Sequence, residues 1–537
     1  MDANEKHLTM QDPRHFLRLK QMIPGNKLLL SGFLASCALM ISLISWTLSS
    51  PLGSSPDENF HIGSIWCAEG EKDGRCAYVN PSGGEQSNPV IVPHVMDVCF
   101  IFYAEQSANC SGDPRSKKPE LVANSSLYPK LFYATHNLLV SDKTQVSGLA
   151  MRLLNSFVAC FVLFMAIILS PLRTRASGLI PFVVTLIPLA IFLIPSLNPS
   201  SWAYIGVGFA WIFQLNATLM SNISANRNKQ IRLANWFMFM FCAALAMGSR
   251  WDSVVYSCLS IVIVFLIARF ERIEVKFLSI MLPALVLLVG ITLLVSHYWM
   301  TAVSGVPVFG NPESISSGWT VENRNLHNLV NLISLPAGVF GLNWGIGWLD
   351  TPLPAIVGIV GVAAYGYFFL ASIPYRLKSH YFLILLLGIS TTGILMYYLS
   401  GSSIVVGELV QPRYILPMVP LILGVGIFSA RFESFLSEMA WARIAFIGAL
   451  IATLHSISLW TNIRRYTLGL EPNQGYNLSN PTTPIEWWWR WAPSPNFVFL
   501  VGTVSFSIFI FTILRIVSHS TKFDESLCET KSSNLRT

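Results

Sequence analysis

Residues 27–61 read KLLLSGFLASCALMISLISWTLSSPLGSSPDENFH. After Lys27, an uncharged apolar run leads into an acidic turn at Asp57 and Glu58. The run 28–49 has the roughly 20 residues that a helix needs to cross a bilayer. It is long for the apolar core of a secretory signal, and no clear small-x-small cleavage site ends it. We therefore expect a retained first membrane span, followed by a loop that opens with the acidic turn.

Runs of this kind recur along the whole chain. Of its 537 residues, 53% are hydrophobic and only 12% are charged, about half the charged fraction of a soluble domain. No compact basic block favours nucleic-acid binding, despite a net charge of +7. We predict an all-α integral membrane protein with about twelve transmembrane helices. The expected spans are 28–49, 151–170, 179–196, 202–221, 234–248, 254–269, 277–296, 354–373, 381–399, 414–430, 443–461 and 496–516.

Positive charge is distributed unevenly between the connections. Lys and Arg gather in the N-terminal tail and in alternate short loops, which the positive-inside rule places in the cytoplasm. We therefore expect cytoplasmic tails at 1–27 and 518–537, flanking a membrane domain at 28–517. The long connections fall on the other side, which we expect to be the working, extracytoplasmic face. These connections are 51–150, 298–352 and 462–495.

Four of the nine cysteines lie in the first long connection. Oxidising compartments favour disulfides, and four cysteines allow three pairings. We favour Cys67–Cys76 and Cys99–Cys110, because each pair closes a short loop. A zinc site is an alternative, although no C-x-x-C spacing supports it.

The acidic turn has two interpretations. As a helix start, Ser55 is the N-cap, Pro56 the first helical residue and Glu58 the reciprocal capping partner. As a chemical site, Asp57, Glu58 and His61 share one helix face. A carboxylate there would act as a general base or help to hold a divalent cation. The two interpretations are compatible, because a helix start holds its carboxylate rigidly.

Several arginines are expected near the outer membrane surface, where the positive-inside rule disfavours them. A single one is typical of an interfacial anchor whose charge reaches toward water. Together they predict an anion site, because a guanidinium binds phosphate through two parallel hydrogen bonds. In order of preference they are Arg413, Arg250, Arg464, Arg465 and Arg152.

The chain resembles the GT-C glycosyltransferase superfamily, and more closely a bacterial membrane-protein family of unknown function within it. The resemblance covers most of residues 28–517. It departs from the pattern at Pro412, where a glycine often precedes the Arg-Tyr pair. The strings that carry it are Pro56-Asp57-Glu58-x-x-His61, Tyr128-Pro129-x-Leu131-Phe132-Tyr133, Arg152-Leu153-Leu154-Asn155, Asn198-Pro199-Ser200, Gly345 to Pro354, Gln411 to Pro417, and Arg464 to Gly469.

The resemblance implies a membrane glycosyltransferase that takes its sugar from a polyprenyl-phosphate donor. The acceptor would be a cell-envelope glycan, lipid or protein at the outer face of a bacterial cytoplasmic (inner) membrane. Asp57 or Glu58 would serve as catalytic base, with Asp57 favoured, or as metal ligand together with His61. A divalent cation is compatible with the site but is not required, and no other cofactor is implied. His61, Tyr128, Asp350 and the outer arginines are the expected substrate contacts.

Segment 326–352 is apolar but interrupted by Pro336 and several glycines. We expect it to lie in the membrane interface or to re-enter the membrane, either cradling an isoprenoid tail or acting as a structural cover. Asp350 at its end would contact a sugar or cap a turn.

Two other functions remain open. The first is a transporter or flippase for lipid-linked sugars, although the expected spans are almost free of charge and show no internal repeat. The second is a non-catalytic scaffold in envelope assembly. The sequence lacks H-E-x-x-H and G-x-S-x-G strings, which makes a hydrolase less favoured.

Overall fold

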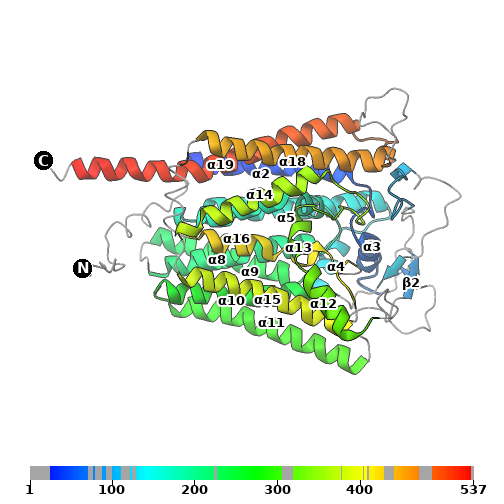
Figure 1. Cartoon of the computed structure of the whole chain (residues 1–537), viewed down its shortest axis with the longest axis horizontal. Coiled ribbons are helices and arrows are strands. Elements are labelled where there is room, and N and C mark those ends of the chain that lie inside the picture. The colour runs from blue at the N-terminus through cyan, green and yellow to red at the C-terminus, as the bar shows by residue number, and fades with distance from the viewer. Residues whose placement is uncertain are drawn as a thin grey trace.

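A bundle of long helices forms most of the molecule, with short helices and strands gathered at one end (Figure 1). The computed structural model describes residues 25–70, 76–78, 88–91, 99–109, 121–123, 128–222, 226–304, 319–375, 378–402, 404–407, 410–428, 439, 441–470 and 486–533. The predicted N-terminal tail therefore lies almost wholly outside the described residues.

Helices overlap all of the predicted spans. They are α2 (Asn26–Ser49), α5 (Thr144–Leu169), α6 (Leu172–Thr185), α8 (Ser200–Leu219), α9 (Asn226–Met247), α10 (Trp251–Phe270), α11 (Phe277–Ser304), α14 (Ala355–Ala371), α15 (Lys378–Ser402), α16 (Met418–Ile427), α18 (Trp441–Leu468) and α19 (Pro495–Ser533). Shorter helical segments are η2 (Leu186–Ala190), α7 (Ile191–Leu193), η3 (Met220–Asn222), η4 (Ile373–Tyr375) and η5 (Pro412–Tyr414).

Within the described part of the chain, 9 helical stretches are long and apolar enough to cross a membrane. Helices α14 and α16 are shorter apolar helices. The predicted all-α, multi-pass membrane fold is confirmed, while the number of crossings beyond those 9 stays a prediction.

Several observed helices are longer than the predicted spans, and in three of them the difference involves charged residues. Helix α5 begins at Thr144, so Arg152 lies two turns inside it instead of at its start. Helix α18 continues to Leu468 and includes the arginines that were expected in the following loop. Helix α19 runs to Ser533, through most of the predicted C-terminal tail. The predictions ended each span at its charges, but a helix can continue beyond the apolar layer because its backbone hydrogen bonds are internal.

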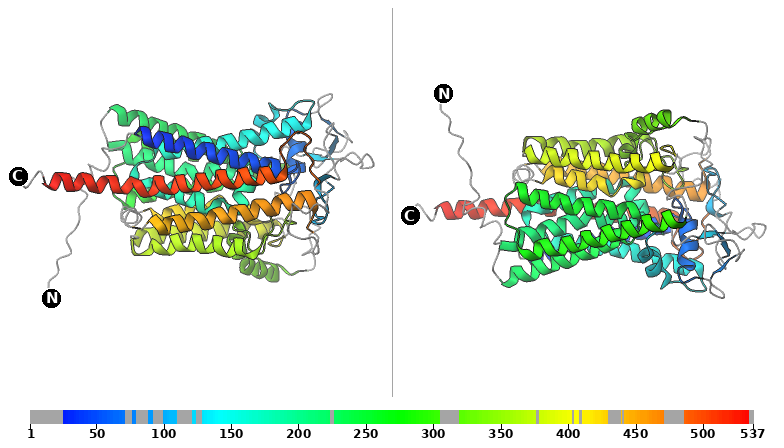
Figure 2. Two further views of the ribbon diagram at one scale, coloured as in Figure 1. Left: turned by 90° about the horizontal axis from the view of Figure 1, so that it is seen from above. Right: turned by 90° about the horizontal axis from the view of Figure 1, so that it is seen from below.

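The start of α2 and the end of α19 lie at the same end of the bundle, opposite the short helices and strands (Figures 1 and 2). This is the arrangement that an even number of crossings produces. Helix α2 packs against α5 and α19, so the first and last long helices are neighbours. Large apolar side chains such as Phe33, Leu288 and Leu385 are exposed on the sides of the bundle, where a bilayer would cover them.

The first long connection folds as a small α/β layer on the bundle. Its elements are α3 (Glu58–Trp66), β1 (Ala77–Tyr78), β2 (Asn88–Ile91), β3 (Leu121–Ala123) and α4 (Lys130–Asn137). The strands form an antiparallel sheet in the order β1-β2-β3, with Ala77 opposite Ile91 and Asn88 opposite Ala123.

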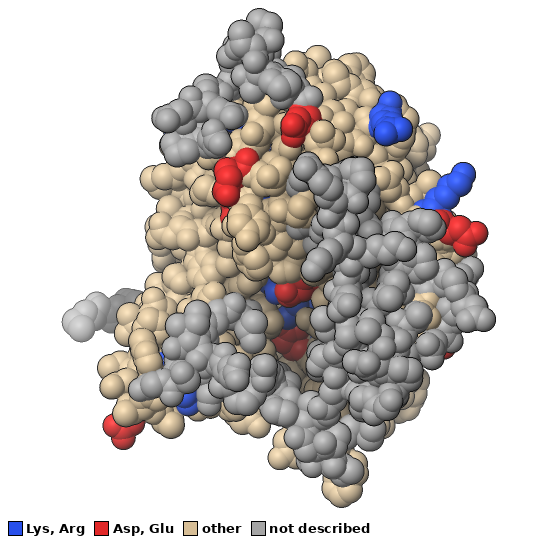
Figure 3. All heavy atoms as spheres, turned by 90° about the vertical axis from the view of Figure 1, so that its right-hand side faces the viewer, with Lys and Arg blue, Asp and Glu red and all other residues tan. Residues whose placement is uncertain are grey.

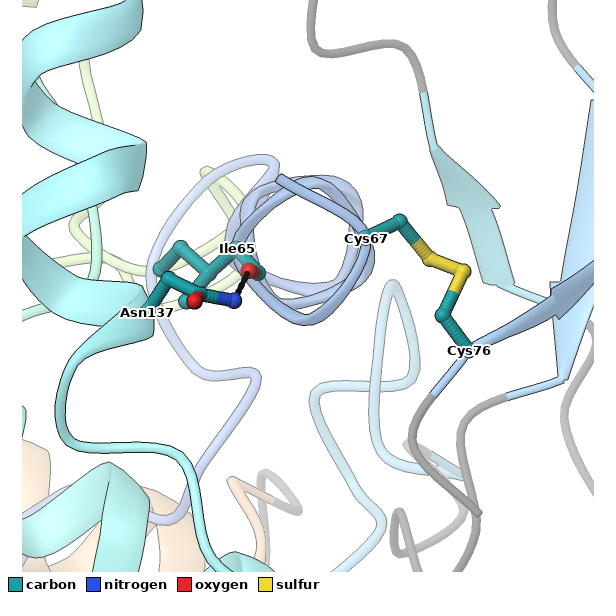
Figure 4. The surroundings of a disulfide bond; sticks show 4 residues. All are labelled: Ile65, Cys67, Cys76 and Asn137. Carbon is teal, nitrogen blue, oxygen red and sulfur yellow. Dashed lines mark hydrogen bonds between the residues drawn. A yellow bond between two sulfur atoms is a disulfide. The ribbon is translucent and has the colours of Figure 1, made fainter. Parts of the chain in front are cut away.

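Helix α3 is fastened at its C-terminal end (Figure 4). The predicted Cys67–Cys76 disulfide is present, and it joins α3 to the start of the sheet. Asn137 of α4 donates a hydrogen bond of 2.8 Å to the carbonyl of Ile65. Cys99 is also disulfide-bonded, but Cys110 lies outside the described residues, so that pairing stays a prediction.

Segment 326–352 does not form a straight span. It contains the end of α12 (Val321–Asn331) and the short helix α13 (Ser334–Val339), followed by a turn closed by the Ile346–Thr351 bridge. Leu326, Val330 and Ile333 are exposed, as expected of helices that face the apolar edge of a membrane. A role in holding an isoprenoid tail stays a prediction.

Candidate functional site

The acidic turn does not begin its helix where the sequence predicted. Asp57 is the N-cap, with a left-handed backbone φ of 59°, and α3 begins at Glu58. Asp is one of the few non-glycine residues that tolerate this conformation, so the backbone can reverse there. The predicted cap at Ser55 is wrong, and the adjacent carboxylates of Asp57 and Glu58 enter different surroundings.

Glu58 is fully buried and forms an ion pair of 2.8 Å with Arg152 of α5. Its carboxylate also accepts backbone hydrogen bonds from Gly53, Ser55 and Leu197 at 2.8–3.1 Å. The hydrogen bond from the backbone N–H of Ser55 to the Glu58 carboxylate is the one that the predicted capping box assigned to Glu58. A buried ion pair is tolerated when hydrogen bonds satisfy its remaining atoms, and this one meets that condition. Glu58 and Arg152 therefore join the first connection to the bundle.

Asp57 is open by comparison, because 40% of its side chain is exposed. Its carboxylate contacts Arg413 of η5 at 2.5 Å, and Arg413 also donates to the carbonyl of Pro56 at 3.0 Å. Partial burial alone would raise the pKa of Asp57. The charge of Arg413 and its hydrogen bond, with a smaller contribution from the charge of Arg250, outweigh burial and lower that pKa below its ordinary value.

Arg250, at the N-cap of α10, lies in the same cluster. It forms an ion pair of 2.8 Å with Asp252 and donates to the hydroxyl of Ser200 at 3.2 Å. Its guanidinium lies 4.4 Å from the ring centroid of Tyr414, and that of Arg413 lies 5.8 Å from the same ring. Two buried guanidiniums therefore share one aromatic neighbour, and both influence the charge of the open carboxylate.

His61 and Tyr128 complete the cluster on the side of α3. His61 is fully buried, and its Nδ1 is 2.9 Å from the hydroxyl of Tyr133. Its Nε2 has no hydrogen-bond partner among the described residues. Burial lowers the pKa of His61 to about 3, against the opposing effect of Asp57, so the imidazole is neutral at physiological pH. The ring of Tyr128 lies 5.1 Å from that of His61, and burial raises its pKa.

Three other predicted substrate contacts lie in different surroundings. Arg465 is fully buried and pairs with Asp350 at 2.9 Å, while it also donates to backbone carbonyls of the first connection. Arg464 precedes it in α18 and is also buried. Asp350 and Arg465 therefore brace two connections against each other. Any contact of these three residues with substrate stays a prediction.

The predicted metal-ligand set does not assemble as expected. Glu58 is paired with Arg152, whereas Asp57 is paired with Arg413. Within the described residues, no group of three or more His, Cys, Asp or Glu side chains has the arrangement of a metal site. Asp57 and His61 are the two groups of that set that remain in one cluster.

The end of the bundle that carries these elements is hollowed near its middle, and basic and acidic side chains show at the bottom of the hollow (Figure 3). The sequence predicted Asp57, His61, Arg250 and Arg413, and the structure brings them within electrostatic reach of one another. Tyr414 was not predicted to belong to this cluster, although its position directly after Arg413 in the sequence indicated that the two lie together.

Fold and site together define a class: multi-pass helical membrane proteins whose charged residues converge at one end of the bundle. Residues 40–422 match the family described as "Predicted membrane protein (DUF2142)", and the chain belongs to that family. The matched segment contains all members of the cluster around Asp57. No curated protein and no solved structure matches the chain.

Proposed function

We propose that the protein is a membrane glycosyltransferase. It moves a sugar from a polyprenyl-phosphate donor to a cell-envelope glycan, lipid or protein at the extracytoplasmic face of a bacterial cytoplasmic membrane. The observation that supports this best is a partly exposed carboxylate, Asp57, at one end of a membrane bundle. It is paired with the buried Arg413, and the buried Arg250 lies within electrostatic reach.

The two arginines suit a lipid phosphate. Each has a planar guanidinium, which presents paired donors to phosphate oxygens. Both lie at the loop end of the bundle, where the headgroup of a membrane-bound donor would be found, with its tail between the helices. Arg250 is already neutralised by Asp252, and Arg413 is paired with the more exposed Asp57. Arg413 is therefore the arginine better able to exchange its partner for a phosphate.

The reaction balances with these groups. The acceptor hydroxyl loses its proton to the Asp57 carboxylate while its oxygen forms a bond to the anomeric carbon of the sugar. The bond from that carbon to the phosphate oxygen breaks, and the electron pair leaves with the polyprenyl phosphate. Arg413 and Arg250 stabilise the additional negative charge on the phosphate. Direct displacement inverts the configuration at the anomeric carbon.

Glu58 is unsuited to the role of base. A base must reach the proton that it removes, and Glu58 has no exposed surface. Its oxygens are engaged by Arg152 and three backbone amides. The neighbouring Asp57 has the free surface that Glu58 lacks.

The low pKa of Asp57 weakens it as a base while Arg413 is its partner. A donor phosphate that draws Arg413 away removes the largest charge that holds this pKa down, and the carboxylate becomes more basic. Donor binding therefore prepares the base, so we expect the donor to bind before the acceptor.

Asp57→Asn tests the assignment. Asn is nearly isosteric, tolerates positive φ and retains an acceptor for Arg413, so the fold should persist. In cells lacking the gene, the donor lipid should accumulate and the envelope should lose one sugar. The unmodified gene should reverse both changes, whereas Asp57→Asn should lower transfer by about 100-fold or more.

Asp142→Asn is the matched control, because Asp142 is an exposed carboxylate just before α5. It should transfer normally. Normal transfer by Asp57→Asn at equal membrane levels would sink the proposed chemistry. Lipid-linked sugar trapped on the cytoplasmic leaflet would instead indicate a flippase.

A further inference from the structure

An exposed aromatic pair lies outside the charged cluster. Phe102 of the first connection is 69% exposed, and its ring centroid is 5.2 Å from that of Trp348, with the ring planes at 69°. Trp348 itself is partly exposed. The two rings come from connections almost 250 residues apart in the chain.

The backbone at this pair is strained. Phe102 has a φ of 63°, and Leu349, next to Trp348, has a φ of 65°. Bulky side chains rarely adopt positive φ, because it crowds the side chain against the backbone. Glycine would avoid this crowding at position 102, and an exposed phenyl ring offsets little of it through burial. Packing therefore does not explain a phenylalanine at this position.

A buried arginine fixes both rings in place. Arg465 donates to the carbonyls of Phe100 and Tyr103, on either side of Phe102, at 2.7 and 2.9 Å. It also holds Asp350, two residues after Trp348. The desolvation of a buried guanidinium is costly unless its donors are well paired, and here the pairing orders the two segments that carry the rings.

The pair is also tied to the turn that carries the proposed base. The indole N–H of Trp348 donates to the carbonyl of Gly53 at 2.8 Å. The amide of Gly53 in turn donates to the buried carboxylate of Glu58 at 3.0 Å, directly after Asp57. The aromatic pair is thus held in a fixed place relative to the open carboxylate.

We propose that Phe102 and Trp348 form an acceptor subsite, on which a sugar ring of an envelope glycan stacks. This rests on the proposed glycosyl transfer and narrows its acceptor to a glycan. The C–H-rich face of a pyranose is apolar and slightly positive, and the face of an aromatic ring is slightly negative. A growing glycan would rest on the pair while its terminal hydroxyl reaches Asp57.

A lipid headgroup is the less suitable occupant. Interfacial tryptophans place the ring among lipids and leave the N–H for the wet headgroup layer. Here the N–H of Trp348 is bound to Gly53. Anchoring in lipid also needs no fixed ring geometry, whereas strain at Phe102 and bonds from Arg465 hold this pair rigidly.

Phe102→Gly is the decisive variant, because it removes the ring and relieves the positive φ. The full-length protein in lipid nanodiscs is titrated with hexasaccharides of β-1,4-N-acetylglucosamine, α-1,4-glucose and α-1,6-mannose, with binding followed by saturation-transfer NMR. We expect at least one to bind, with an affinity about tenfold weaker in Phe102→Gly. The unfolding temperature should not fall.

Trp491→Ala is the matched control, because Trp491 is 62% exposed and its ring centroid lies 5.4 Å from that of Trp489. Among the described residues, its indole has no hydrogen bond to the turn that carries Asp57. It should bind the hexasaccharide as the unmodified protein does. Equal affinity in Phe102→Gly, or no binding of any of the three glycans by the unmodified protein, overturns the subsite. So does broadening of a 4-fluorophenylalanine signal at position 102 by spin-labelled lipid and not by a water-soluble reagent.

The proposed subsite and the proposed role of Asp57 as base are contradicted by different results. Asp57→Asn should bind the glycan normally and transfer nothing. Glycan binding that depends on Phe102, with normal transfer by Asp57→Asn, would overturn the base and leave the subsite. Loss of transfer in Asp57→Asn, with glycan affinity unchanged in Phe102→Gly, would overturn the subsite and leave the base.

Discussion

Asp57 and Glu58 are neighbours in sequence, and each is paired with an arginine, yet they are opposites in the structure. Glu58 is wholly buried, with Arg152 and three backbone amides around it. Asp57 keeps 40% of its side chain exposed and has Arg413 as its partner. The left-handed backbone at Asp57 separates them, because it sends consecutive side chains into different environments.

The difference shows how one short string serves two purposes. The buried pair cannot exchange partners without leaving an uncompensated charge, so it fixes the turn to α5. The open pair can exchange its arginine for water or a ligand at much lower cost, because solvent screens it. The rigid pair thereby positions the exchangeable one.

The largest expected effect comes from breaking the buried pair. Arg152→Met should destabilise the protein by about 3–5 kcal/mol, because Glu58 is left charged and buried. Arg413→Met should cost much less, since Asp57 can rehydrate. Thermal unfolding in nanodiscs and the level of folded protein in membranes measure both. Equal losses would show that the two pairs are not different in kind.

A smaller effect should follow from Arg413→Lys. An ammonium cannot reproduce the fork that contacts Asp57 and the carbonyl of Pro56, so transfer should fall by about tenfold to a hundredfold while folding persists. Transfer rates in membranes with equal protein levels measure this. Arg443→Lys, at an exposed residue near the start of α18, should retain full transfer. An unchanged rate in Arg413→Lys would remove Arg413 from the donor site.

The smallest expected change is in pH dependence. Because Arg413 lowers the pKa of Asp57, the stability from their contact is present at neutral pH and is lost only as pH falls through the lowered pKa. Arg413→Gln should raise that pKa in the free enzyme, so the acid limb of kcat/KM, which reports the free enzyme, should move to higher pH. Rate–pH profiles of both proteins test this. An acid limb that stays in place, or moves lower, contradicts the coupling.

The helices of the bundle were predictable because apolar length alone decides which segments can cross a bilayer. The limits of the helices were not predictable in the same way, because a hydropathy pattern treats a charge such as Arg152 as the end of a span. Arg152 instead lies buried inside α5, where Glu58, 94 residues earlier in the chain, pairs with it. The charged members of the cluster were likewise predictable from their motifs. The separation of Asp57 and Glu58 into an exposed and a buried environment was not predictable, because no local sequence pattern shows that Asp57 adopts positive φ or that Glu58 pairs with Arg152.

The brace formed by Arg465 also has a consequence for biosynthesis. Its bond to the carbonyl of Phe100 joins residues 365 positions apart. During synthesis, the first connection is made early and must wait for most of the chain to be inserted before this contact can form. This end of the bundle is therefore completed among the last steps of assembly. A truncated chain that ends before α18 would carry its acidic turn without the contacts of Arg465 that brace the first connection.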